Sequence, residues 1–174
     1  GDGEPLSLAL RGEGDLAHAT LQGEFTQGSR RLQLQPSTLR LDDGVVQVES
    51  VAVALAPGQV QVRGSIDLGA DAPVLAVDVA ASELEFGGAD GAVPLRVEAT
   101  ARIDGPLTDY AASGSAQLQR GEERAELNLE GQGSEAGLAF DRLSLVSPHG
   151  RLDAAGRVDW SPQLQWKFDA SLKA

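Results

Sequence analysis

The feature that most constrains this chain is a strict alternation of apolar and polar residues near its C-terminus. In two runs, Leu152 to Trp160 and Leu164 to Leu172, every second residue is apolar or glycine. A period of two is that of a β-strand with one dry and one wet face. Ser161-Pro162-Gln163 separates the runs, and proline there favours a reversal of the chain. We therefore predict an antiparallel hairpin.

The same pattern recurs earlier in the chain and indicates an internal repeat. Residues 64–67 match 156–159, and residues 14–23 match 105–114, each displaced by about 90 positions. Repeats of this kind form stacked arrays in which the individual units do not have separate hydrophobic cores. We expect a first β-repeat unit over 1–86, a glycine-rich loop over 87–91 and a second unit over 92–174, all within one continuous domain.

Composition favours an all-β fold. Aromatic residues make up only 4% of the chain, there is no Met, and 21 glycines interrupt any long helix. Reading the alternation along the chain predicts about fourteen strands of about seven residues and no helix. A sheet of that size measures roughly 23 Å across and over 60 Å in length. Its single apolar face is too large to stay bare in water, so we expect it to fold over itself or to hold a ligand.

Charge and residue content exclude several classes of function. A net charge of −12 repels phosphate backbones and argues against nucleic acid as a partner. The absence of cysteine removes disulfides, zinc–cysteine sites and thiol catalysis together. No apolar run approaches the length of a membrane-spanning helix. The chain begins without Met and stops within the alternating pattern, so we expect it to be a piece of a longer protein whose cut sheet edges pair with neighbouring β-repeats.

Catalytic and metal-binding candidates are weak. His18 and His149 occupy non-equivalent places in the repeat, and Asp42-Asp43 before Gly44 is typical of a turn. The sequence has neither a G-x-S-x-G nucleophile elbow nor a phosphate-binding loop. We therefore predict no enzyme activity, no catalytic residue, no metal and no cofactor.

Three neighbouring segments, 137–145, 150–160 and 162–166, resemble the repeats of the TamB family within the AsmA-like group. The Gly-x-(apolar)-Asp-Trp run at 156–160, followed by Pro-x-Leu-x-Trp at 162–166, is the most specific part. The first copy departs from it, with Leu68 and Val77 at the positions of Trp160 and Trp166. The resemblance implies a β-taco, which is a long and mostly antiparallel sheet curled into a trough with an apolar concave interior.

The same resemblance implies a location and partners. Proteins similar to this one are anchored in the inner membrane, cross the periplasm and meet the outer-membrane barrel TamA. They are associated with outer-membrane protein assembly and with phospholipid transport between the two membranes.

Our leading hypothesis is a hydrophobic groove that shields phospholipid acyl chains, or unfolded outer-membrane protein strands, from water. The alternative is a structural or adhesive β-repeat with a filled core and no ligand. Small residues such as Gly64, Gly114 and Gly156 either leave room on the dry face or let the sheet bend. The residues expected to line the groove are Leu21, Phe25, Val53, Val60, Val62, Ile66, Leu68, Leu75, Val77, Val79, Val97, Ile103, Leu127, Leu129, Phe140, Leu145, Leu152, Val158, Trp160, Leu164, Trp166 and Phe168.

Overall fold

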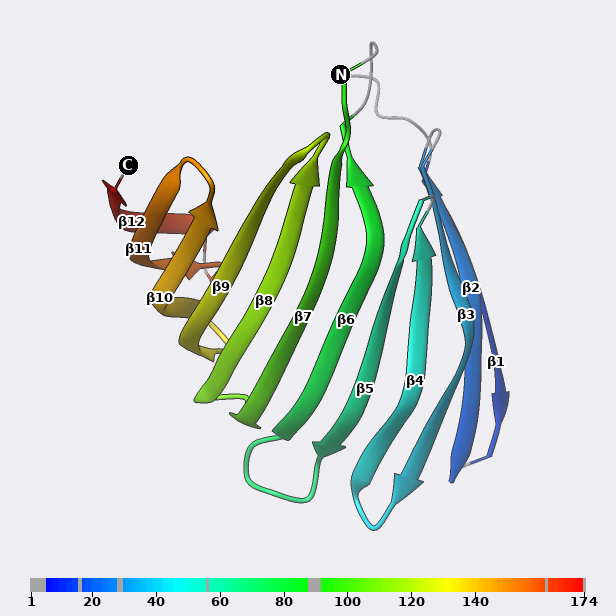
Figure 1. Ribbon diagram of the computed structural model, residues 1–174. Coiled ribbons are helices and arrows are strands. Elements are labelled where there is room, and N and C mark those ends of the chain that lie inside the picture. Colours follow the sequence, from blue (N-terminus) through cyan, green and yellow to red (C-terminus); the bar gives the residue numbers. More distant parts are fainter. Residues whose placement is uncertain are drawn as a thin grey trace.

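The chain forms a single β-sheet in which strands that follow one another in sequence also lie side by side (Figure 1). The computed structural model describes residues 6–15, 17–27, 30–55, 57–87, 92–161 and 163–173, and within these ranges there is no helix. All eleven neighbouring pairs are antiparallel. The strands are β1 (Leu6–Gly14), β2 (His18–Gln27), β3 (Arg30–Asp42), β4 (Val45–Leu55), β5 (Gln59–Asp67), β6 (Val74–Phe86), β7 (Leu95–Pro106), β8 (Tyr110–Arg120), β9 (Glu123–Ser134), β10 (Gly137–Ser147), β11 (Gly150–Asp159) and β12 (Gln165–Lys173).

Twelve long strands stand where about fourteen short ones were expected, because β-bulges were mistaken for strand ends. In β4 the apolar series changes phase between Val48 and Val51, and the pairing register with β5 shifts at that point. An extra residue in one strand restores the apolar side chains to their original face while the strand continues. Register shifts at the corresponding phase changes of β3, β6 and β10 do the same.

Glycine and proline lie inside several strands without ending them. Residues 12–14 belong to β1, Pro36 lies inside β3, residues 104–106 end β7 and residues 131–134 end β9. The pairing of β1 with β2 continues through 12–14, and that of β8 with β9 continues through 131–133. At Pro36, by contrast, the registers of β3 with both of its neighbours shift, and proline has no N–H to donate to the ladder.

The C-terminal hairpin is confirmed, although Pro162 itself lies outside the described residues. β11 and β12 pair from Leu152 opposite Leu172 to Val158 opposite Trp166. Along this hairpin the apolar residues therefore share one face. The division of the chain into two repeat units stays a prediction; β6 and β7, which lie on either side of the expected boundary, are paired strands of the same sheet.

The sheet is curled but open. In Figure 1 the strands β4 to β9 present a broad face, β1 to β3 are seen edge-on at one side, and β10 to β12 turn away at the other. Extensive contacts between elements occur only between neighbouring strands of the sheet. The accessible surface is 11867 Å² for a mass of 18.1 kDa, whereas a compact monomer of this mass exposes about 8,100 Å². No second layer formed by the described residues covers this sheet.

The described residues contain very little buried core. Ala52, Tyr110 and Ala112 are the only buried apolar residues among them, and Ser37 and Ser144 are the buried polar ones. Stability must therefore come from the backbone ladder and from side-chain pairs across neighbouring strands. This arrangement does not match the filled core of the alternative hypothesis.

Candidate functional site: the apolar face of the sheet

The pairing registers align apolar residues into rows that run across the strands. Because directly opposed residues of antiparallel strands point to the same face, a row can be followed from partner to partner. One row crosses all twelve strands and spans about 53 Å along the sheet. It consists of Leu10, Gly23, Leu34, Val53, Val60, Ala81, Ala99, Ala116, Leu127, Leu145, Leu152 and Leu172.

A second row runs beside the first over nine strands. Its members are Val48, Gly64, Val77, Ile103, Ala112, Gly131, Phe140, Gly156 and Phe168. The polar residues between these positions along each strand face the other way. Together the rows define what we call the apolar face.

Most of the expected groove residues lie on this face. All but Leu68, Trp160 and Leu164 are within strands and in phase with the two rows. Those three lie in the connections beside β5, β11 and β12, where they are exposed. The indole N–H of Trp160 donates a hydrogen bond of 2.7 Å to the carbonyl oxygen of Glu135, which holds it to the neighbouring turn.

Sequence reasoning missed Tyr110, the aromatic residue with the greatest burial among those described. Its ring lies over Gly133, its direct partner on β9, and a Cβ atom on that glycine would overlap the ring. The signal was present in the alternation, since Tyr110 is in phase with Ala112. Its partner was not predictable, because only the register of β8 and β9 brings the two positions together.

Aromatic rings also fill the space above another glycine of this face. Phe140 and Phe168 flank Gly156 from β10 and β12, with their ring centroids 5.9 Å apart in a stacked arrangement. A Cβ atom on Gly156 would overlap the ring of Phe168. Glycine therefore allows aromatic packing here and does not leave empty room on the face.

Gly64 has a different role, which is to let the strand bend. Its φ angle is +140°, and a Cβ atom would overlap the backbone oxygen of Ala76 on β6. A positive φ of this kind is accessible to glycine and strained for other residues. At Gly64 the structure supports the bending role over that of leaving room.

The opposite face carries the charges, many of them in ion pairs between neighbouring positions. Arg96 Nε lies 2.9 Å from Glu85 Oε1, and Arg102 lies 3.5 Å from Asp78 and 3.3 Å from Asp104. These side chains are mostly exposed, so each pair adds little to stability. Their main effect is to keep this face polar and hydrated.

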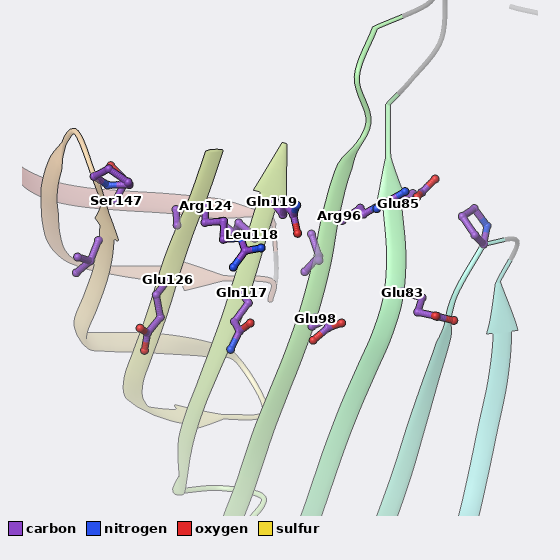
Figure 2. A pocket seen from close by; sticks show the side chains of 15 residues that line it. Glu83, Glu85, Arg96, Glu98, Gln117, Leu118, Gln119, Arg124, Glu126 and Ser147 are labelled. Atoms are coloured by element: carbon purple, nitrogen blue, oxygen red, sulfur yellow. Dashed lines mark hydrogen bonds and ion pairs between the residues drawn. The ribbon is translucent and has the colours of Figure 1, made fainter. Parts of the chain in front are cut away.

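Three hollows lined by described residues lie on this polar side. One of about 910 Å³ lies over β6 to β9 near one end of these strands (Figure 2). Its charged lining consists of Glu83, Glu85, Arg96, Glu98, Arg124 and Glu126. A hollow of about 640 Å³ over β5 to β9 and one of about 560 Å³ over β10 to β12 also have polar linings. The apolar face carries none of these three hollows and is an open surface.

Two carboxyl groups on the surface have shifted pKa values. Backbone N–H groups of His18 and Ala17 donate to Asp15, at 2.8 Å each, and lower its pKa. Arg151 Nε donates to Asp153 at 2.7 Å and is the main cause of the lowered pKa of that carboxyl. Both arrangements fix local geometry at the surface.

The described residues show no cluster of catalytic or metal-binding groups. His18 lies 3.9 Å from Asp15, and His149 lies 3.5 Å from Glu123, each at a separate turn. No set of three or more His, Cys, Asp or Glu residues in the described ranges is placed to hold a metal ion. The same ranges contain no helix that is both long and apolar enough to span a membrane.

A single-layer antiparallel sheet, with one apolar and one charged face, defines this chain as an extended β-repeat protein. The family model described as TamB, N-terminal domain, matches residues 16–174, and the chain belongs to this family. Proteins of the family are transport and assembly components that span the periplasm from an inner-membrane anchor and act with TamA. No curated protein and no solved structure matches the chain.

Proposed function

We propose that this domain shields phospholipid acyl chains on its apolar face during transfer between the inner and outer membranes. The observation that carries the proposal is the row of apolar residues that crosses all twelve strands without a covering layer. Monomers seldom expose more than a few hundred Å² of contiguous apolar surface unless that surface binds something. Membership of the TamB family supports a periplasmic location and a partnership of the parent chain with TamA.

The energetics favour capture without polar recognition. Each methylene removed from water contributes about 0.8 kcal/mol, so a chain of about sixteen carbons gains roughly 12 kcal/mol before the cost of ordering it. The rows offer many similar positions along about 53 Å and no single deep pocket. Such a surface suits a ligand that moves along it, and it requires no catalytic step.

Photo-crosslinking from neighbouring positions on opposite faces tests the proposal. A photoreactive amino acid at Val79 or Val158 should crosslink to labelled phospholipid supplied in vesicles. The same group at Asp78 or Arg157, one residue away on the charged face, is the matched control and should not. Equal crosslinking from both faces would refute the proposal. A peptide from an unfolded outer-membrane strand, offered in place of lipid, tests the other cargo.

A solvatochromic dye separates this function from the structural alternative. An uncovered apolar face should give strong ANS fluorescence in the folded protein, and phospholipid should compete with the dye. A repeat domain with a filled core should give little signal. A weak signal from the folded chain would therefore favour the scaffold role.

A further inference from the structure

The two ends of the strands differ in charge. Because neighbouring strands are antiparallel, alternate connections of the chain gather at each end of the sheet. The end that lies lowermost for β5 to β9 in Figure 1 holds the connections 15–17, 43–44, 68–73, 107–109, 135–136 and 160–164. Five of these six carry an aspartate or glutamate, and none carries a lysine or arginine. We call this end of the sheet the acidic rim.

The cations nearest to the acidic rim do not offset its charge on the apolar side. On β7 to β12 they are Arg102, Arg157 and Lys167, which are out of phase with the apolar rows and therefore lie on the charged face. Arg102 and Arg157 are already in ion pairs with aspartates there. A ligand on the apolar face that reaches this rim therefore meets an acidic end of the sheet.

Tyr110 places a polar atom on the apolar face just inside this rim. It directly follows Asp109, and its ring lies over Gly133, which precedes Glu135 by two residues. Neighbouring turns of the rim are two strands apart, so the ring lies between two acidic turns that are separated by roughly 10 Å. Tyr110 is only 9% exposed, yet its hydroxyl makes no hydrogen bond to a described residue and is not sealed off from the surface.

An apolar path leads away from Tyr110 along β8. The next residues of this strand on the apolar face are Ala112, Gly114, Ala116 and Leu118. The path from Tyr110 to Leu118 measures roughly 27 Å. The hydrocarbon of one leaflet, which is half of a bilayer core of about 30 Å, measures about 15 Å. An acyl chain that starts at Tyr110 therefore ends on the apolar face, short of the opposite end of the strands.

We propose that Asp109, Tyr110 and Glu135 hold the headgroup of a phospholipid that carries a primary ammonium group, such as phosphatidylethanolamine. The tyrosine hydroxyl donates a hydrogen bond to an ester or phosphate oxygen, and the two carboxylates take the ammonium group. An aromatic ring with a polar tip suits this junction between apolar and wet surroundings. A headgroup with a net negative charge is repelled by the acidic rim.

This inference rests on the proposed function and adds to it the kind of headgroup and its orientation. The acyl chains run from the acidic rim along β8, and the headgroup stays in water beyond the ends of β8 and β9. Both of these strands are paired on either side, so the site does not involve an outer edge of the sheet.

Competition between two phospholipids with the same acyl chains tests the proposal. The chain carries a photoreactive amino acid at Leu129, on the apolar face of β9, and is mixed with vesicles that hold phosphatidylethanolamine and phosphatidylglycerol in equal amounts. Mass spectrometry identifies the crosslinked lipid. At low ionic strength we expect phosphatidylethanolamine in about tenfold excess. Added salt should reduce this excess, because the carboxylates are exposed.

Charge reversal at each end of the sheet separates the rim from the net charge of the chain. Asp109→Lys combined with Glu135→Lys should remove the excess. Glu122→Lys combined with Glu123→Lys changes the net charge equally, but in the turn between β8 and β9 at the opposite end, and should leave the excess unchanged. Tyr110→Phe keeps the ring over Gly133 and should lower the crosslinking of both lipids about fivefold.

The outcomes distinguish this inference from the function on which it rests. Equal crosslinking of the two lipids by the wild type would overturn the headgroup site and leave the shielding of acyl chains standing. Equal shifts from the two charge reversals would overturn it as well, because net charge and not the rim would then select the lipid. So would a Tyr110→Phe variant that crosslinks like the wild type. No crosslinking of either lipid would overturn both the headgroup site and the proposed function.

Discussion

Replacing Gly64 by alanine tests whether glycine is required for the bend of the sheet. The added Cβ would meet the backbone oxygen of Ala76, which cannot move without disturbing the pairing of β5 with β6. The φ angle of +140° is itself strained for alanine. Strained backbone positions cost of order 1–3 kcal/mol, and the overlap with backbone places Gly64→Ala at the upper end, about 3 kcal/mol.

Gly87→Ala is the matched control. Gly87 also has a positive φ, +78°, but apart from its chain neighbours no atom of the described residues lies within 4 Å of the position of its Cβ. Its replacement should therefore cost only the conformational strain, about 1 kcal/mol. Comparing the two variants separates the overlap with β6 from the φ preference.

Thermal unfolding followed by circular dichroism measures both variants. For a chain of this size, 1 kcal/mol lowers the midpoint by roughly 2–4 °C. We expect a drop of roughly 6–12 °C for Gly64→Ala and roughly 2–4 °C for Gly87→Ala. A loss at Gly64 no larger than that at Gly87 would refute the assignment of Gly64 to close backbone contact.

Two further predictions concern packing and pH. Tyr110→Ala removes the ring that is buried over Gly133 and should lower the free energy of unfolding by about 3 kcal/mol. Phe86→Ala, at a 55% exposed position, is the control and should lower it by under about 1 kcal/mol. Urea denaturation measures both variants, and equal losses would contradict the packing role of Tyr110. Because the pKa of Asp153 is lowered in the folded state, the stability that this carboxylate contributes is present above its ordinary pKa of 3.8 and is lost as the pH falls through the lowered value. Arg151→Gln should raise the pKa of Asp153 toward 3.8, and an unchanged carboxyl titration by NMR would show that the guanidinium is not its cause.

The fold class and the apolar face could be predicted from the sequence because both follow from the period of two. The pattern fixes which residues share a face within a strand, as at Leu152 to Val158, and it places their hairpin correctly. It does not distinguish a strand end from a bulge. Val48 and Val51 are out of phase in either case, and only the pairing with β5 shows that the strand continues.

The partners of individual side chains could not be predicted for a related reason. Tyr110 and Gly133 are neighbours through the register of β8 and β9, which depends on the whole ladder between them. Trp160 was placed on the apolar face by its phase with Val158, yet the strand ends at Asp159 and the indole binds the turn at Glu135. Beyond the last backbone pair of a strand, the alternation of apolar and polar residues no longer predicts which face a side chain lies on.

Within the described ranges no second layer covers the sheet, and this explains why its two faces differ so strongly. Each strand contacts its neighbours and little else, so the apolar rows are shielded only by one another and by the curl of the sheet. As a result, the accessible surface is about half again that of a compact monomer, and more apolar surface stays in contact with water. The net charge of −12, placed on the other face, opposes association through that face. What remains available for contact is the apolar face, which suits acyl chains.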